Sequence, residues 1–167
     1  LNPVIFLDKR KFKVQEEKNK TIYLSKEIKI KDFKKIIISW NIVTPVDSYV
    51  DIEARVLVNN NLKEKIWSKW LSWGRWGTNI KRASNSSNCT EAKINVDTLT
   101  INEGYIGEAI QIKISSYYDD KESKADLQLV VITYCGEKIN NKNGKEKLIN
   151  KLIETPCISQ MKREAEI

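Results

Sequence analysis

The chain of 167 residues contains no histidine, so it lacks the commonest general base of enzymes and the commonest metal ligand. The Ser-His and Cys-His pairs of hydrolases are therefore excluded within this sequence. Its three cysteines, Cys89, Cys135 and Cys157, lie far apart and form no CxxC pair. We predict no metal site, no cofactor and no disulfide framework, and a single bridge is the open alternative.

Long apolar runs are also missing. No stretch of about 18 apolar residues occurs, so we expect no membrane span. The N-terminal segment LNPVIFLDKRKF has an apolar run too short for a signal peptide and no small-residue cleavage site. The sequence leaves secreted, cell-surface and cytoplasmic locations all open. It does not begin with methionine, which favours a fragment of a longer protein.

The net charge of +7 is unevenly distributed along the chain. Residues 1–35 hold 11 Lys/Arg against 5 Asp/Glu, whereas residues 36–135 hold 11 against 12. The positive excess therefore lies mainly at the N-terminal end and not on the expected folded core. A nucleic-acid site needs a basic face with interleaved aromatic rings or a known recognition motif, and neither is present. We expect no nucleic-acid partner.

Several segments alternate apolar and polar residues with the period of a β-strand. In SYVDIEARVLV (48–58) every second residue from Val50 to Val58 is apolar, and apart from Leu57 the residues between them are polar. In EAIQIKISSYY (108–118) Ile110, Ile112 and Ile114 alternate with polar residues, so both segments predict strands buried on one face. The run KKIIISWNI (34–42) is continuously apolar and predicts a buried strand. Further strands are expected at residues 21–24, 27–30, 92–96 and 125–134.

Polar segments with turn chemistry separate these strands. Asn59–Asn61 predicts a hairpin loop, because asparagine tolerates positive φ, and residues 83–88 and 119–121 predict further loops. We predict an all-β fold, an antiparallel β-sandwich of jelly-roll or galactose-binding-like type, over residues 1–135. A polar linker is expected at 136–147, and the apolar residues of 148–167 predict the opening of a further domain.

The segment WSKWLSWGRWG (67–77) holds four of the five tryptophans at intervals of three residues. On a strand, Trp67 and Trp73 share a face with Leu71, so we expect both indoles in the core. Trp70 points the other way, and the glycines at 74 and 77 permit a bulge that leaves Trp76 unassigned. We therefore predict that Trp70 or Trp76 is substantially exposed.

Exposed indoles on a sandwich favour a ligand site. We predict that Trp70 and Trp76 contact a sugar ring or a peptide, with Arg75 and Lys69 as polar partners. The alternative is that the rings only pack the core and a strand edge. Asp119 and its neighbour Asp120 are expected in a solvated turn, and calcium binding by such Asp- and Asn-rich loops is the alternative there.

Three segments together resemble a known family. ISWNIVTPVDSYVDIEARV (38–56), WSKWLSWGRWG (67–77) and INVDTL (94–99) resemble the N-terminal region of clostridial-type cysteine peptidases. These belong to family thirty-nine of the papain-like clan, related to the peptidases that process bacteriocin leaders. The resemblance covers residues 36–135 well and residues 1–35 weakly. It implies a β-sandwich that precedes a peptidase domain.

The segment TPCISQM (155–161) resembles the opening of that peptidase domain, where Ser-Gln-Met precedes the nucleophilic cysteine. By this resemblance Gln160 is the donor of the oxyanion hole. Its nucleophile is expected within about 10–15 residues after Gln160. The sequence stops before that position, and Cys157 lies on the wrong side of the glutamine. The alternative for Gln160 is an ordinary surface residue.

These observations predict that the chain alone is not an enzyme and that its parent is a papain-like cysteine peptidase. The expected function is that of a non-catalytic accessory domain that recruits or positions substrate for a C-terminal peptidase domain. The first alternative is a carbohydrate-binding module acting at a cell surface, and the second is a purely structural domain. The expected partners are the C-terminal peptidase domain and a peptide or glycan.

Overall fold

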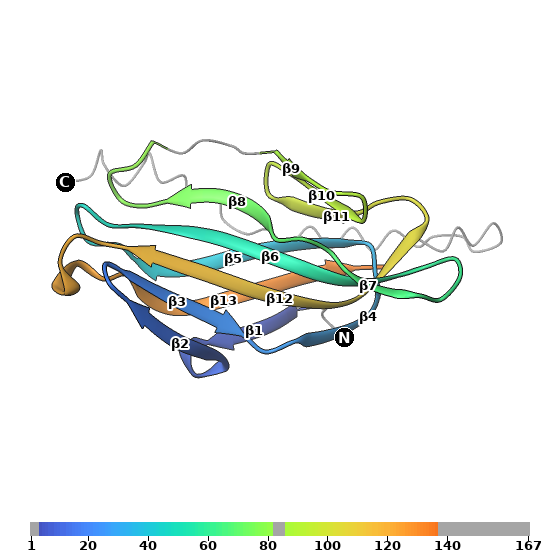
Figure 1. Cartoon of the computed structure of the whole chain (residues 1–167), viewed down its shortest axis with the longest axis horizontal. Helices are drawn as coiled ribbons and strands as arrows, with labels where there is room; N and C mark the ends of the chain where they lie inside the picture. Colours follow the sequence, from blue (N-terminus) through green and yellow to red (C-terminus); the bar gives the residue numbers. More distant parts are fainter. Residues whose placement is uncertain (1–3, 82–85, 137–167) are drawn as a thin grey trace, which may run out of the picture. The chain divides into compact units, whose positions relative to one another are not determined.

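The computed structural model describes residues 4–81 and 86–136, which form two antiparallel β-sheets packed as a sandwich (Figure 1). The predicted all-β sandwich is confirmed. Helical structure in this part of the chain is limited to two 3-10 turns, η1 (Lys9–Lys11) and η2 (Lys121–Ser123). The chain divides into two units, Leu1–Glu137 and Lys138–Ile167, and every described residue belongs to the first.

One sheet has six strands and brings the first and last described strands together. Val4 in β1 lies opposite Thr133 in β13, so β13 is flanked by β1 on one side and β5 on the other. The strand order is β1 (Val4–Asp8), β13 (Asp126–Cys135), β5 (Lys35–Val43), β11 (Thr98–Ile101), β10 (Ala92–Asn95) and β9 (Ser87–Asn88).

The other sheet is built around two long strands, β12 (Tyr105–Tyr117) and β6 (Tyr49–Asn60), which pair along their whole length. On the far side of β12 lie β3 and then β4, end to end; on the far side of β6 lie β8 and β7. Strand β2 pairs with β3 and forms an edge of the sheet. The bounds of these shorter strands are β2 (Phe12–Glu17), β3 (Lys20–Ser25), β4 (Ile28–Phe33), β7 (Lys65–Trp67) and β8 (Leu71–Trp76).

The core lies between the two sheets and follows the alternation in the sequence. Every second residue of β6 from Val50 to Val58 is fully buried, as are Ile112 and Ile114 of β12. From the six-stranded sheet, Ile36 and Ile132 are fully buried in the same core. Each buried valine or isoleucine of this set contributes about 1.5–3 kcal/mol, so this pattern supplies the main driving force for the fold.

Strand β4 is held on β12 by a ring packed against a glycine. A bulge interrupts the register of β12 between Gly107 and Ala109, and Gly107 lies opposite Phe33. A Cβ atom at Gly107 would lie 2.4 Å from the Phe33 ring, which is itself fully buried. Only glycine therefore leaves room for the ring at this place.

Two expectations about the strands were wrong in detail. The run 34–42 is not buried throughout, because β5 alternates: Ile36 and Ile38 face the core, whereas Ile37 is 41% exposed. In the loop after β6, the residue with positive φ is Lys63 and not an asparagine. Asn60 instead accepts hydrogen bonds from the N–H groups of Leu62 and Glu64 through its side-chain oxygen.

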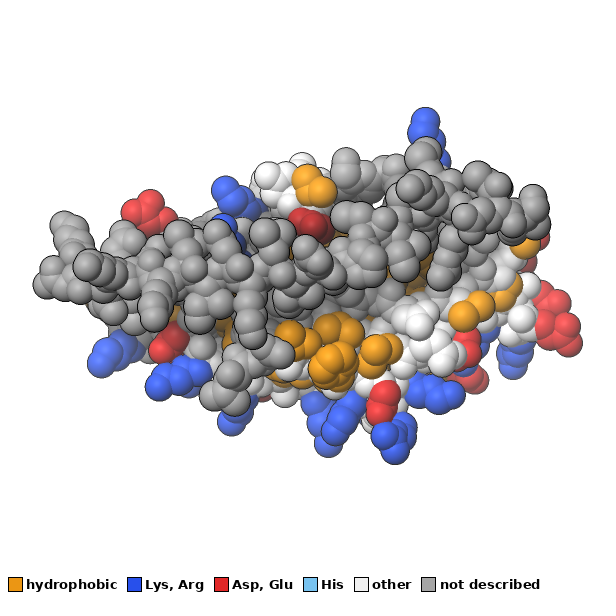
Figure 2. Space-filling view, turned by 180° about the vertical axis from the view of Figure 1, so that it is seen from behind, with side chains coloured by type: hydrophobic (Ala, Val, Ile, Leu, Met, Phe, Trp, Pro, Cys, Tyr) orange, Lys and Arg blue, Asp and Glu red, His pale blue; other side chains and the backbone are white. Residues whose placement is uncertain are grey.

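Apolar side chains also lie on the outside of the six-stranded sheet. Phe6 of β1 is 65% exposed, and it shares the outer face with Val131 and Ile37. Figure 2 shows hydrophobic side chains gathered on the face seen from behind.

Among the described residues, no helix is long and apolar enough to cross a membrane. The predicted segment 148–167 and, except for Gly136, the predicted linker lie outside the described residues.

Candidate functional site: the aromatic–cation face

The tryptophans of residues 67–76 do not divide between core and surface as predicted. Trp73 is buried in the core, which confirms its predicted place, and its indole N–H donates to the Asp97 carbonyl at 3.0 Å. Trp67 was also expected in the core but is only half-buried. Trp70 and Trp76 are half-buried too, so the expected substantial exposure of one of them is wrong.

Ser68 is the reason that the alternation fails between Trp67 and Leu71. Its backbone N–H donates to the Val56 carbonyl at 2.8 Å, and its hydroxyl accepts from the Val56 N–H at 3.0 Å. Both polar groups of Val56 are thus satisfied by one residue outside a strand. Since the chain between β7 and β8 is not extended strand, Trp67 pairs with the outward Leu57, whereas Leu71 pairs with the buried Ala54.

A second irregularity places Trp76 on the core side. The register between β6 and β8 shifts near Gly74, whose φ of 91° is accessible to glycine. After the shift, Trp76 lies opposite the buried Val50 and packs against the core. Arg75 lies opposite Asp51 and faces outward.

The outer face of the seven-stranded sheet carries a cluster of stacked rings and cations, which we call the aromatic–cation face. The Arg55 guanidinium lies 4.7 Å from the centre of the Trp67 ring and 5.1 Å from that of Trp70. The Lys113 ammonium lies 4.3 Å from the Trp70 ring. One arginine of β6 and one lysine of β12 thus hold two indoles that come from outside the pair of long strands.

The same face continues towards the other end of β6 and β12. Tyr49 and Tyr117 are directly paired across these strands and stack at 5.0 Å with an interplanar angle of 21°. Arg75 covers the Tyr49 ring at 4.7 Å, and Lys20 of β3 covers Tyr117 at 5.2 Å. Each cation–ring contact of this kind contributes about 0.5–1 kcal/mol at a partly exposed site.

Two of the four cations on this face form ion pairs within it. Lys113 contacts Glu53 at 3.3 Å, Arg75 contacts Asp51 at 3.6 Å, and the Arg55 Nε donates to the Gln111 side chain at 2.9 Å. Burial raises the pKa of Asp51 above its usual value, and the Arg75 charge opposes this shift without cancelling it. Arg55 and Lys20 add two further cations to these two ion pairs, so the face is aromatic and carries a net positive charge.

The predicted ligand residues are only partly brought together. Trp70 and Arg75 both belong to the aromatic–cation face, and Lys69 is exposed next to Trp70. Trp76 faces the other side of the sheet. The sequence interpretation missed Arg55, Lys113 and the Tyr49–Tyr117 stack. Their outward positions follow from the alternation in 49–58 and 111–117, but their proximity depends on the pairing of β6 with β12.

The described residues hold no group of three or more Cys, Asp, Glu or His that could bind a metal ion. Burial raises the pKa of the Cys89 thiol, and its Sγ donates to the Ala92 carbonyl at 3.3 Å, so the reactive thiolate is disfavoured. Asp120 uses its carboxylate to cap η2 by accepting from the Glu122 N–H at 3.3 Å. Gln160 lies outside the described residues.

Comparison with known proteins gives one family match. Residues 13–133 match the family model described as the peptidase C39 N-terminal domain. The matched segment runs from β2 to β13 and includes the whole aromatic–cation face. No curated protein and no solved structure matches the chain.

Proposed function

Because the chain belongs to the family of peptidase C39 N-terminal domains, we propose that it is a non-catalytic accessory domain that recruits or positions substrate for a C-terminal peptidase domain. The family match is the observation that carries this proposal, since it covers nearly the whole sandwich. The absence of histidine from the sequence supports a role in binding and not in catalysis. That the parent is of clostridial type is part of the same proposal.

We propose the aromatic–cation face as the surface that contacts substrate. Tryptophan, tyrosine and arginine are the residues most enriched where protein surfaces bind partners. Here their rings are already fixed by neighbouring cations, so little side-chain freedom is lost on binding. Trp70, Arg75 and Lys69 are the proposed contacts, and Trp76 supports the face from its core side.

Within the same proposal, residues 148–167 open the peptidase domain, and Gln160 is its oxyanion-hole donor. This assignment rests on the SQM sequence alone.

An array of immobilised peptides, probed with the purified chain, tests the function. We expect a reproducible set of bound peptides whose affinity falls at least fivefold in Trp70→Ala. The matched control is Phe6→Ala, which truncates an exposed ring on the opposite sheet and should bind like the wild-type chain. Absence of peptide binding, or equal loss in both variants, would contradict the proposal.

A parallel glycan array separates the carbohydrate-binding alternative. The indoles of Trp67 and Trp70 favour this alternative, because aromatic rings stack on apolar sugar faces. Arg55 and Lys113 weigh against it, since they already contact these rings. Binding to glycans but not to peptides, lost in Trp70→Ala, would support the carbohydrate-binding module. If the chain binds to neither array, the result would favour the alternative that it is a purely structural domain.

A further inference from the structure

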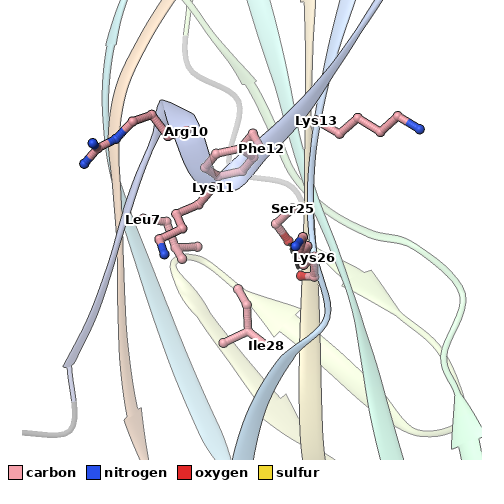
Figure 3. Close-up of a pocket in the computed structure, with 8 residues that line it drawn as sticks. All are labelled: Leu7, Arg10, Lys11, Phe12, Lys13, Ser25, Lys26 and Ile28. Carbon is pink, nitrogen blue, oxygen red and sulfur yellow. Dashed lines mark hydrogen bonds between the residues drawn. The ribbon is translucent and has the colours of Figure 1, made fainter.

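A second surface, distant in the sequence from the tryptophans, combines an apolar floor with a basic rim. A cavity of about 530 Å³ lies where β1, η1 and the start of β2 meet the end of β3 and the start of β4 (Figure 3). Leu7 and Phe12, both buried, form its floor with the half-buried Ile28. We call this cavity the basic opening, after the cations around it.

Four cations line the basic opening, and no carboxylate does. Arg10 is neutralised by Asp8, whose carboxylate it contacts at 2.8 Å. Lys11, Lys13 and Lys26 have no ion pair among the described residues. Figure 3 shows Lys11 across the opening, whereas Arg10 and Lys13 point outward on either side. Among the described residues, no carboxylate of the lining balances this positive charge, which lies beside an apolar floor within the N-terminal segment that carries most of the net charge.

Two unpaired strand edges border the same opening. Strand β2 pairs with β3 only as far as the Phe12–Ser25 pair, so β4 has no strand on its outer side within the described part of the chain. Among residues 4–81 and 86–136, strand β1 likewise pairs with β13 alone, so its other edge has no strand partner there. Free edges present backbone N–H and C=O groups that can hydrogen-bond to an added strand.

We propose that the basic opening binds an extended acidic peptide, which adds a strand to the edge of β4 and places one apolar side chain over Leu7, Phe12 and Ile28. The rim lysines supply the charge complementarity, and they also disfavour pairing with a second copy of this basic edge. Exposed Glu27 precedes β4 and exposed Asp32 lies within it, so the acidic residues of the peptide are expected near Lys11 and Lys26 instead. The free strand edges favour a peptide over a fatty-acid carboxylate.

Fluorescence anisotropy with a labelled ten-residue peptide tests this site. The probe alternates Thr and Glu around one central Leu, and its charge-reversed counterpart carries Lys for Glu. We expect the acidic probe to bind the full chain and the basic probe not to bind. Lys11→Glu/Lys26→Glu should weaken binding at least tenfold, and Lys11→Gln/Lys26→Gln should weaken it less.

The matched control is Lys93→Glu/Lys121→Glu, which changes the net charge equally at exposed lysines far from the opening in sequence. It should change affinity less than twofold. Equal weakening by both charge reversals would overturn the proposal, because it would show only long-range attraction. A probe methylated on alternate backbone nitrogens should lose binding; unchanged binding would overturn the added strand. Binding of dodecanoate without binding of the acidic probe would assign the opening to a fatty acid.

This site does not rest on the proposed function. Trp70→Ala should leave binding of the acidic probe unchanged, and the lysine variants should leave binding on the peptide array unchanged except for acidic peptides. Failure of one proposal is therefore distinguishable from failure of the other.

Discussion

In Trp73, both the ring and the polar atom of the side chain have their partners inside the protein. The ring is 8% exposed, and the indole N–H has a backbone partner in Asp97. Trp67, in contrast, contacts Arg55 on the outer face. The same residue type thus serves the core at one position and a surface cluster at another.

We therefore expect Trp73→Ala to lower the free energy of unfolding by about 3–5 kcal/mol, the range found for truncated core aromatics. Trp67→Ala should lower it by only about 1–2 kcal/mol, because it removes a cation–ring contact and partial burial. Urea denaturation of both variants measures the difference. Equal losses would show that Trp67 belongs to the core after all.

Asp51 gives the face a pH-dependent contribution to stability. Because burial raises its pKa in the folded state, its ionisation works against folding. Its favourable contribution is complete below the unfolded pKa and is lost as the pH rises through the folded pKa. We expect the free energy of unfolding of Asp51→Asn to equal that of the wild-type chain at about pH 3 and to exceed it at about pH 7.

Urea denaturation at both pH values measures this difference. The exposed Asp119→Asn serves as the control and should follow the wild-type chain at both values. A gain for Asp51→Asn that is larger at low pH would contradict the sign of the shift.

Strand β4 depends on the close packing of Phe33 on Gly107. We expect Gly107→Ala to lower the free energy of unfolding by about 1–3 kcal/mol or more, since the new methyl group must displace a buried ring. The comparison is Gly104→Ala, where the added Cβ meets nothing within 4 Å but φ is +86°. That change should cost about 1 kcal/mol.

A double-mutant cycle with Phe33→Leu checks the cause. If the ring is the obstacle, Phe33→Leu should reduce the cost of Gly107→Ala, so that the two changes are not additive. Additive losses would place the strain elsewhere in the bulge.

Strands with regular alternation could be predicted from the sequence, and strands with local breaks could not. Residues 50–58 of β6 place Val50, Ile52, Ala54, Val56 and Val58 inward, as predicted, because period two and one buried face fix the register of the strand. The tryptophan segment failed because Ser68 and the shift near Gly74 each interrupt the period. The hydrogen bonds of Ser68 to Val56 cannot be predicted from the alternation of apolar and polar residues.

At the scale of the whole molecule, the sandwich was predictable but its surfaces were not. The aromatic–cation face exists only because β6 and β12, about 60 residues apart, pair so that Tyr49 lies opposite Tyr117 and Arg55 opposite Gln111. The basic opening likewise needs β1 and β4 to lie on different sheets. Pairing between distant strands is the information that a single sequence carries most weakly.

The position of β13 between β1 and β5 has a consequence for synthesis of the chain. At about 5–20 residues per second, β1 is made on the order of ten seconds before its partner strand β13. During that time the edges of β1 and β5 are unpaired, which is the condition under which nascent chains associate with one another. Residues 1–35, with 11 Lys/Arg against 5 Asp/Glu, are made before the rest of the sandwich, and repulsion between such segments opposes the association of unfinished chains.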